Sequence, residues 1–163
     1  MAMRIGHGVD VHAFDAGRPL VLCGVELPDA EGLEGHSDAD VALHAVTDAV
    51  LGAMAAGDLG EYFPPDDPAW RNAASSVFVE YALELAAARG FRMVNCDLTI
   101  LGERPRIAPH RPALRSSLAA ILGVEESVVS VKATTSDGLG FVGRGEGLCA
   151  IATVLMEEAI DDE

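Results

Sequence analysis

Aromatic and positively charged side chains are scarce in this sequence of 163 residues. Only 5% of the residues are aromatic although half are hydrophobic, so the core must be built mainly from alanine, valine, leucine and isoleucine. Eleven lysines and arginines stand against 26 aspartates and glutamates, which gives a formal net charge of −15. Such a charge repels nucleic acids and anionic membrane surfaces. A phosphorylated ligand would therefore need a metal ion, an arginine or a helix N-terminus to receive it.

Paired cysteines and long apolar runs are also lacking. The three cysteines, Cys23, Cys96 and Cys149, form no CxxC motif and lie among apolar neighbours, as small buried residues do. The first residues contain no apolar signal-peptide core, and no run is long enough to span a bilayer. We therefore expect a soluble, cytoplasmic protein with no membrane or nucleic-acid partner.

Hydrophobic periodicity and turn residues predict interleaved strands and helices. Strands are expected at 4–12, 19–27, 95–101, 128–135 and 147–156, and helices at 37–56, 73–89 and 112–122. The segments 31–35 and 58–68 are expected to be loops. The chain, 1–163, is interpreted as one α/β domain of two layers, an α+β arrangement with helices packed on one face of a mixed β-sheet.

The last expected strand, GLCAIATVLM, is apolar at nearly every position, which indicates that both of its faces are covered. A single layer of helices covers only one face. Two explanations stay open: a central strand sandwiched within the chain, or a second face packed against other subunits. The chain is expected to be oligomeric.

A metal site is the first chemistry that the residue types suggest. Residues two apart in a strand share a face, so Asp10 and His12 would present a carboxylate and an imidazole side by side. His44, within the helix expected at 37–56, could add a third ligand. Two histidines and one carboxylate suit zinc or a similar metal and leave a position open for substrate. The alternative, that His44 is a hydrogen-bonded residue of the core, stays open.

Other polar residues surround this histidine in the sequence. Ser37 is expected to be the N-cap of the same helix, where it and His36 could receive a phosphate. Asp40 and Asp48 lie four residues on either side of His44. They could orient its ring or be solvated acids of the helix surface.

The segment KATTSDGLGFVGRGEG contains the spacing G-x-G-x-x-G at Gly138, Gly140 and Gly143. A dinucleotide-binding turn must lead from a strand into a helix, whereas this segment leads into the last expected strand. That interpretation is rejected, and the glycines are expected to form a tight connection.

Two polar clusters follow expected strands and could bind an anion. Residues 134–137 offer hydroxyls for phosphate oxygens and a carboxylate for a second cation such as Mg²⁺, although a structural turn would use the same residues. The loop LGERPRIAPHRP carries Arg104, Arg106 and Arg111, a large share of the positive charge. Solubility could also explain these arginines.

Four segments in order, RIGHGVDVHAF, EGHSDADVALHAVTDAVLGA, GDLGEYFPPDDP and KATTSDGLGFVGRGEG, resemble the family of 2-C-methyl-D-erythritol 2,4-cyclodiphosphate synthases over essentially the whole chain. The resemblance implies a homotrimer with active sites between neighbouring subunits. It also implies a phosphorus–oxygen lyase of the non-mevalonate isoprenoid pathway. That enzyme converts 4-diphosphocytidyl-2-C-methyl-D-erythritol 2-phosphate, a small cytidine diphosphate substrate, to the 2,4-cyclodiphosphate and releases CMP.

The resemblance further implies roles for individual residues. Asp10, His12 and His44 would ligate one Zn²⁺ per subunit, and His36 and Thr135 would stabilise the transition state. The residues implied to contact the substrate are Asp10, His12, His36, Ser37, Asp58, Leu59, Gly60, Phe63, Pro64, Pro65, Asp66, Asp67, Gly102, Glu103, Arg104, Pro105, Arg106, Ile107, Ala108, Thr134, Thr135, Ser136, Asp137, Phe141 and Arg144.

Two positions depart from the family pattern. Asp137, in the region implied to hold a second metal, stands where glutamate is expected. Its shorter carboxylate would still bind Mg²⁺ or Mn²⁺ beside the substrate diphosphate, through water. Val9 stands where some members carry phenylalanine, so binding of isoprenoid diphosphates on the trimer axis is not implied for this chain.

Two other functions are kept as alternatives. A metal-dependent phosphohydrolase would release inorganic phosphate instead of CMP. A non-catalytic trimer would bind cytidine nucleotides without consuming the substrate.

Overall fold

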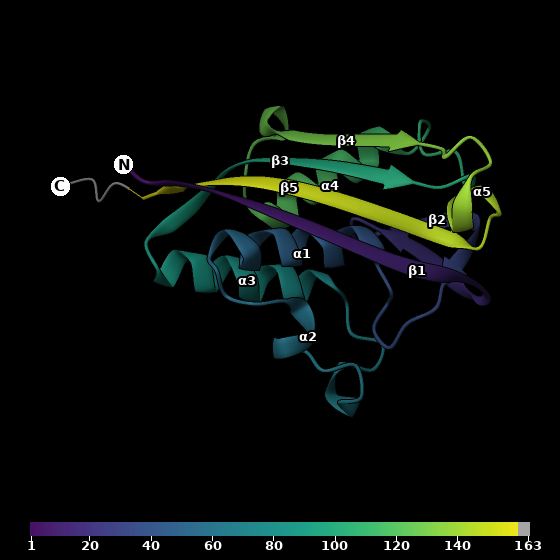
Figure 1. Ribbon diagram of the computed structural model, residues 1–163, viewed down its shortest axis with the longest axis horizontal. Coiled ribbons are helices and arrows are strands. Elements are labelled where there is room, and N and C mark those ends of the chain that lie inside the picture. The colour runs from purple at the N-terminus through teal and green to yellow at the C-terminus, as the bar shows by residue number, and fades with distance from the viewer. Residues whose placement is uncertain (160–163) are drawn as a thin grey trace.

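A computed structural model describes residues 1–159, which contain a five-stranded mixed sheet in the order β2-β1-β5-β3-β4 (Figure 1). Strands β3 and β4 are parallel, and the other neighbours are antiparallel. The longer helices, α1, α3 and α4, pack against one another on one face of the sheet (Figure 1). The predicted mixed sheet with helices on one face is confirmed. The strands are β1 (Met3–Leu22), β2 (Val25–Leu33), β3 (Phe91–Leu101), β4 (Val129–Thr134) and β5 (Gly147–Glu158).

The hairpin at the start of the chain turns later than the sequence predicted. Strand β1 runs through the whole of the expected gap between 4–12 and 19–27, and the turn to β2 lies at Cys23 and Gly24. Both turn residues have positive φ, 51° and 75°, as a two-residue hairpin turn requires. The predicted division into two short strands is therefore wrong. Strand β2 also takes in the first residues of the expected loop at 31–35.

Helix α1 (Val41–Ala53) is shorter than the helix predicted at 37–56. Ala39 has a φ of 57°, which is incompatible with a helix, and Asp40 is the N-cap. The prediction of Ser37 as N-cap is wrong. Because Ser37 lies before the helix, an anion beside it would be met by its hydroxyl group and not by the helix terminus.

Asp40 connects the start of α1 to the β1–β2 turn. Its buried carboxylate accepts hydrogen bonds from the backbone N–H groups of Leu43, Cys23 and Gly24 at 3.0, 3.1 and 2.7 Å. Burial raises the pKa of this carboxyl to about 6, although the N–H groups oppose the rise. The Asp40 carboxylate therefore holds the hairpin against the helix. Among the described residues it makes no hydrogen bond to the His44 ring, so the hypothesis that Asp40 orients this ring is not supported.

Replacing Asp40 with alanine should lower the free energy of unfolding by about 3 kcal/mol, because three backbone N–H groups, two of them buried, lose their acceptor and α1 loses its cap. Urea denaturation measures this change. Glu84→Ala, at an exposed position of α3 (Ser76–Ala88), is the control and should change stability by less than about 0.5 kcal/mol. Unchanged stability in Asp40→Ala would contradict the role given to this carboxylate.

The other long helices and the later strands lie close to their predicted positions. Helix α3 falls within the expected range of 73–89. Helix α4 (Arg111–Leu122) ends at Gly123, whose φ of 67° gives a left-handed C-cap. Strand β3 starts four residues earlier than expected, at Phe91, where it follows α3 after a short turn.

Four shorter elements were not predicted. The expected loop at 58–68 contains one turn of helix, α2 (Leu59–Tyr62), and leads into a 3₁₀ turn at Pro68–Trp70. A second 3₁₀ turn, Glu126–Val128, precedes β4. The glycine segment forms a single helical turn, α5 (Gly140–Gly143), and then enters β5, so it is not a dinucleotide-binding turn.

Helix α1 lies in backbone contact with β1. A Cβ atom at Gly8 would stand 2.0 Å from the Ala45 carbonyl oxygen, and one at Gly6 would stand 1.7 Å from that of Ala49. These two glycines therefore allow the helix to approach the strand closely. The approach brings His44 of α1 over the face of β1 that carries Asp10 and His12.

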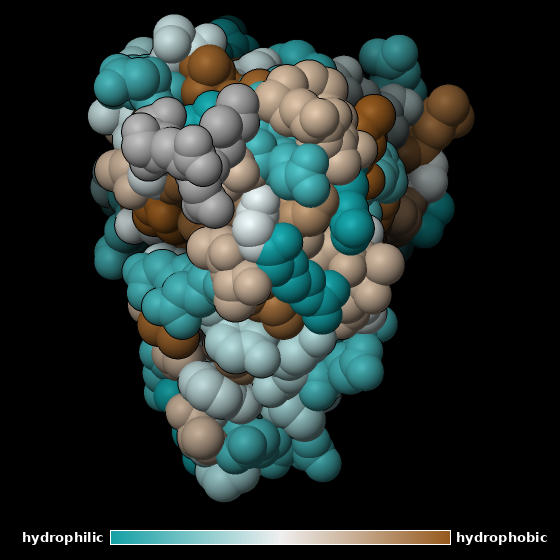
Figure 2. Space-filling view, turned by 90° about the vertical axis from the view of Figure 1, so that its left-hand side faces the viewer, coloured by the Kyte–Doolittle hydropathy of each residue, from teal (hydrophilic) through white to brown (hydrophobic). Residues whose placement is uncertain are grey.

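The sheet face opposite the helices is not covered within residues 1–159. Met3, Ile5, Val9 and Val11 of β1 are exposed there, at 48% or more. Ile151 of β5 is only partly buried, so the explanation of a strand sandwiched within the chain is wrong. By contrast, Figure 2 shows the end of the molecule near the chain termini, where hydrophobic residues form small patches separated by hydrophilic ones.

Two general expectations can be compared with the described residues. Cys23, Cys96 and Cys149 are buried and free, as predicted. Within residues 1–159, no helix combines the length and the apolar character that crossing a membrane requires.

Candidate metal centre and active site

Three potential metal ligands converge where α1 crosses β1. Asp10 Oδ2 lies 2.8 Å from His12 Nε2 and 3.0 Å from His44 Nδ1, and the two nitrogens are 3.1 Å apart. His12 is partly buried and His44 is buried, while Asp10 remains accessible from a cavity. The structure thus brings together the three residues that the sequence proposed as metal ligands.

In each histidine, the ring nitrogen that points away from Asp10, here called the outer nitrogen, has its own hydrogen-bond acceptor. His12 Nδ1 lies 2.5 Å from the backbone carbonyl oxygen of Glu34, to which it donates. His44 Nε2 lies 2.9 Å from Ser75 Oγ and 3.2 Å from Ser37 Oγ. A neutral imidazole carries one N–H, so these contacts leave both inner nitrogens with lone pairs directed at Asp10. Three acceptors facing one another form a site suited to a cation.

The pKa shifts show that this cluster attracts positive charge. Burial acts to raise the pKa of Asp10, but hydrogen bonds and charge from His12 and His44 outweigh it and lower the pKa to about 2. Burial acts to lower the pKa of His12, but its hydrogen bond to Asp10 and the charge of that carboxylate raise it overall. A proton or a metal ion can supply the charge that the carboxylate favours.

A cavity of about 240 Å³, called here the metal-side cavity, opens beside these ligands. One side carries the polar residues of the cluster and its neighbours, and the other side is apolar. Phe63 and Trp70 meet edge to face there, with ring centroids 5.0 Å apart. The lining residues are Asp10, His12, Gly35, His36, Ser37, His44, Leu59, Phe63, Pro64, Pro65, Trp70 and Phe78.

The segment 35–37 is held in place from two sides. His36 Nε2 donates to the carbonyl oxygen of Asp67 at 2.9 Å, which ties the segment to the loop after α2. The Arg18 guanidinium donates to the carbonyl oxygens of Gly35 and Ser37. Both residues that the sequence proposed here, His36 and Ser37, are held where they line the metal-side cavity.

A second cavity of about 180 Å³ lies where β3 and β4 end. It shares no lining residue with the metal-side cavity. Two of the three clustered arginines, Arg106 and Arg111, contribute to it. The lining residues are Gly102, Glu103, Pro105, Arg106, Ile107, Ala108, Arg111, Ala133, Thr134 and Thr135.

Several residues proposed from the sequence line neither cavity in a single chain. Arg104 turns away, its guanidinium 2.7 Å from Glu31 and stacked on the Phe14 ring at 4.1 Å. Asp58 caps α2 by accepting from the backbone N–H of Glu61. The residues outside both cavities are Asp58, Gly60, Asp66, Asp67, Arg104, Ser136, Asp137, Phe141 and Arg144.

The glycine-rich segment presents polar groups to solvent. Asp137 has a φ of 53°, and its backbone N–H lies 3.4 Å from Thr135 Oγ1. Arg144 is exposed and pairs with Glu146 at 2.8 Å. This pair raises the pKa of Arg144 and lowers that of Glu146.

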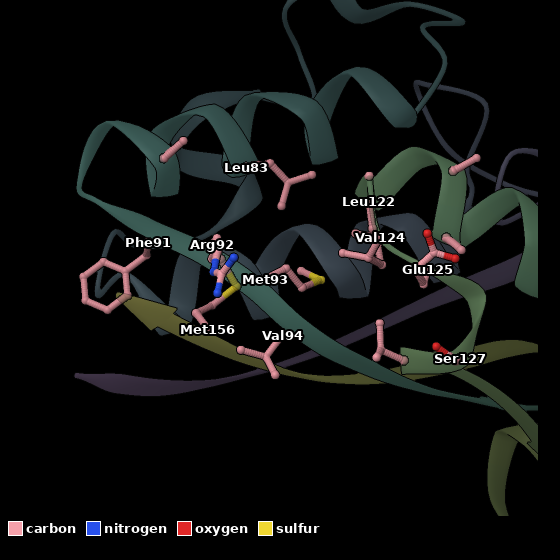
Figure 3. A pocket seen from close by; sticks show the side chains of 15 residues that line it. Leu83, Phe91, Arg92, Met93, Val94, Leu122, Val124, Glu125, Ser127 and Met156 are labelled. Atoms are coloured by element: carbon pink, nitrogen blue, oxygen red, sulfur yellow. The ribbon is translucent and has the colours of Figure 1, made fainter. Parts of the chain in front are cut away.

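A larger cavity, about 770 Å³, lies between α3, α4 and β3 and is mainly apolar (Figure 3). Arg92 lies within it but is paired with Glu157 at 2.7 Å. Its lining contains no histidine, cysteine or aspartate. The candidate metal ligands line the metal-side cavity instead, although that cavity is smaller.

Sequence reasoning missed five residues of the metal side, namely Arg18, Asp38, Trp70, Ser75 and Phe78. Ser75 and Phe78 come from α3 and the residue before it, and Trp70 from a 3₁₀ turn. Aromatic residues are rare in this chain, yet Phe63, Trp70 and Phe78 lie close together in the sequence, and this was the available signal. The structure shows that all three line one cavity.

Comparison with known proteins gives consistent matches. A family model described as the YgbB family matches residues 3–157. A 2-C-methyl-D-erythritol 2,4-cyclodiphosphate synthase from Cereibacter sphaeroides is 56% identical over 159 residues, which cover 98% of this chain and 100% of that protein. A solved synthase described as the CDP-bound form has 40% identity and a TM-score of 0.87, covering 94% of this chain and 100% of its own. The bifunctional IspDF from Campylobacter jejuni has a TM-score of 0.92 at 38% identity, over 96% of this chain and 42% of its own.

Proposed function

Because this chain belongs to the YgbB family, we propose that it closes a cyclodiphosphate ring by intramolecular phosphoryl transfer. The substrate is 4-diphosphocytidyl-2-C-methyl-D-erythritol 2-phosphate, and the products are 2-C-methyl-D-erythritol 2,4-cyclodiphosphate and CMP. This is a lyase reaction of non-mevalonate isoprenoid biosynthesis. The observation that carries the proposal is the convergence of Asp10, His12 and His44 beside a cavity, in a chain 56% identical to a named synthase.

The metal centre is assigned to Zn²⁺, one ion per subunit. Two imidazoles and one carboxylate suit zinc and leave a fourth position open toward the cavity. Bound there, zinc would supply a Lewis acid next to the reacting phosphate. Asp137 is assigned to the second metal, Mg²⁺ or Mn²⁺, which accompanies the substrate diphosphate, and Thr134 and Ser136 are assigned to the diphosphate itself.

In the reaction, an oxygen of the 2-phosphate forms a bond to the β-phosphorus. The bond from that phosphorus to the oxygen bridging it to the α-phosphate breaks, and CMP leaves with this oxygen. The second pKa of a phosphate monoester is about 6, so the nucleophile is ionised near neutrality and the protein need not supply a base. Holding both phosphates in one composite site can contribute roughly 7–11 kcal/mol to lowering the barrier.

The chain's own residues bind and orient the substrate. His36, held by the Asp67 carbonyl group, and the Thr135 hydroxyl would stabilise the charge that develops on the transferring phosphoryl group. Ser37 borders the metal-side cavity beside His36 and would contact a phosphate oxygen there. The apolar wall around Phe63 would contact the methylerythritol carbon chain.

The cavity where β3 and β4 end is assigned to the cytidine nucleotide. Its wall is built largely from the backbone of residues 102–108, and Arg106 adds positive charge in an acidic chain. A relative that shares the fold at 40% identity is described as bound to CDP, which supports a cytidine nucleotide as the ligand.

A homotrimer in the cytoplasm is the assembly proposed. The exposed apolar face of the sheet, with Met3, Ile5 and Val11, suits contact with other subunits. The metal-side and nucleotide cavities share no residue in one chain, so a complete site would combine them across a subunit boundary. Free, buried cysteines suit a reducing compartment.

The test is incubation of the purified protein with the diphosphocytidyl substrate and Mg²⁺, with and without a zinc chelator. Phosphorus NMR should show the cyclodiphosphate forming together with an equal amount of CMP, and chelation should stop both until zinc is restored. Release of inorganic phosphate would indicate a phosphohydrolase instead. Nucleotide binding without any turnover would indicate a non-catalytic trimer.

A further inference from the structure

Ser75 has hydrogen-bond partners that are unusual for a serine at the start of a helix. It occupies the N-cap position of α3, where a serine hydroxyl normally accepts from the backbone of its own helix, yet it makes no side-chain cap bond. The side chain is fully buried and instead lies between His44 and Asp38. The Ser75 side chain therefore makes these two contacts in place of a capping hydrogen bond.

The direction of the hydrogen bonds follows from the chemistry of the partners. An ionised carboxylate can only accept, so the Ser75 hydroxyl donates to Asp38 Oδ1. The backbone N–H of Ser75 donates to Oδ2 of the same carboxylate at 3.1 Å, which fixes the two residues against each other. With its proton committed to Asp38, Ser75 Oγ offers lone pairs to His44 Nε2, 2.9 Å away.

This orientation determines which nitrogen of His44 carries the proton. An N–H on Nε2 donates to Ser75, so Nδ1 keeps its lone pair. That lone pair faces Asp10 Oδ2 at 3.0 Å and His12 Nε2 at 3.1 Å, in the assigned metal position. The opposite tautomer would place a proton where the metal belongs and would set an imidazole lone pair against the Ser75 oxygen.

We propose that Asp38 and Ser75 form a positioning relay that fixes the tautomer and ring orientation of His44, so that Nδ1 is presented to the metal. The relay rests on the metal centre of the proposed function. It adds two residues that touch neither metal nor substrate. His12 is held in the equivalent way by the backbone carbonyl of Glu34, which no substitution removes, so His44 is the ligand at which the idea can be tested.

Thr47 provides a matched control. It is fully buried on α1, and its hydroxyl donates to the carbonyl oxygen of Leu43 in the same helix at 2.8 Å. Among the described residues this hydroxyl makes no hydrogen bond to His44, Asp38 or Ser75. Thr47→Val therefore removes a buried hydroxyl from the same helix and leaves the Asp38–Ser75 pair intact.

The experiment measures metal binding to metal-free protein by competition with a chromophoric chelator, and records the visible spectrum of the Co²⁺-substituted protein. Ser75→Ala is expected to lower the affinity for Zn²⁺ by about 10- to 100-fold and to alter the Co²⁺ spectrum, the size of effect seen when a ligating histidine loses its outer partner. Asp38→Asn should also lower the affinity and alter the spectrum, and Thr47→Val should change neither by much.

Wild-type affinity and an unchanged Co²⁺ spectrum in Ser75→Ala would overturn the relay. If Ser75→Ala does not fold, Asp38→Asn decides by the same two readouts. A wild-type protein that binds no zinc would overturn the metal centre itself, which distinguishes failure of the proposed function from failure of the relay alone.

Discussion

His44→Ala should lose its zinc and should lose turnover by about 10³-fold or more, the scale at which removal of a principal electrostatic group acts on an enzyme. His44 is the one ligand that comes from α1, and the other two, Asp10 and His12, come from β1. Without it, one carboxylate and one imidazole remain, which is fewer than the three protein ligands of catalytic zinc sites. Helix α1 itself should persist, because His44 is one of many buried residues along it.

The measurement is zinc content per subunit together with the rate of CMP release. His7→Ala is the control for zinc content, since His7 lies on the same strand as Asp10 and His12 but bonds Thr153 on the opposite face of the sheet. That variant should keep its zinc. A His44→Ala protein that lacks zinc and still turns over the substrate would refute the metal assignment.

Gly8→Ala should destabilise the protein by about 3 kcal/mol, at the upper end of what overpacking a core commonly costs. The new methyl group would stand 2.0 Å from the Ala45 carbonyl oxygen and 2.7 Å from the Ala49 nitrogen. These are backbone atoms of α1, so no rotamer change relieves the clash and the helix must move away from β1. His44 precedes Ala45, and its Nδ1 would move away from Asp10, so zinc affinity should fall with stability.

Urea denaturation and zinc titration measure the two effects. Gly52→Ala is the matched control, because Gly52 belongs to α1 and faces β1, but its added methyl group would be 3.7 Å from the nearest atom of β1, the His7 carbonyl oxygen. It should be neutral or should stabilise the helix by up to about 1 kcal/mol. If Gly8→Ala were as stable as the wild type, close contact between α1 and β1 would not be what positions His44.

Much of the site could be predicted from local rules. The two-residue spacing of Asp10 and His12 places them on one face of a strand, and His44 stood out as a polar residue in an apolar helix. The end of α4 at Gly123 and the position of β5 also follow from short-range patterns. These features depend on residues within a few positions of one another, which a sequence displays directly.

Misplaced boundaries arose where a distant contact determined a local conformation. Ser37 has the chemistry of an N-cap, but Asp40 takes that position because its carboxylate also receives the N–H groups of Cys23 and Gly24 from the hairpin turn. The hairpin turns at these two residues, which lie inside the strand predicted at 19–27.

By itself, therefore, the sequence determined the residue types of the metal centre, the class of fold and the family to which the chain belongs. Only the tertiary structure decided that His12 and His44, 32 residues apart, bring their nitrogens within 3.1 Å, and that Ser75, 31 residues beyond His44, accepts from the other side of its ring. It also decided that the metal-side and nucleotide cavities are separate in one chain. The physical reason is that side-chain spacing fixes only which face a residue occupies. Which faces meet depends on how closely backbones can approach, and here Gly6 and Gly8 let α1 lie directly on β1.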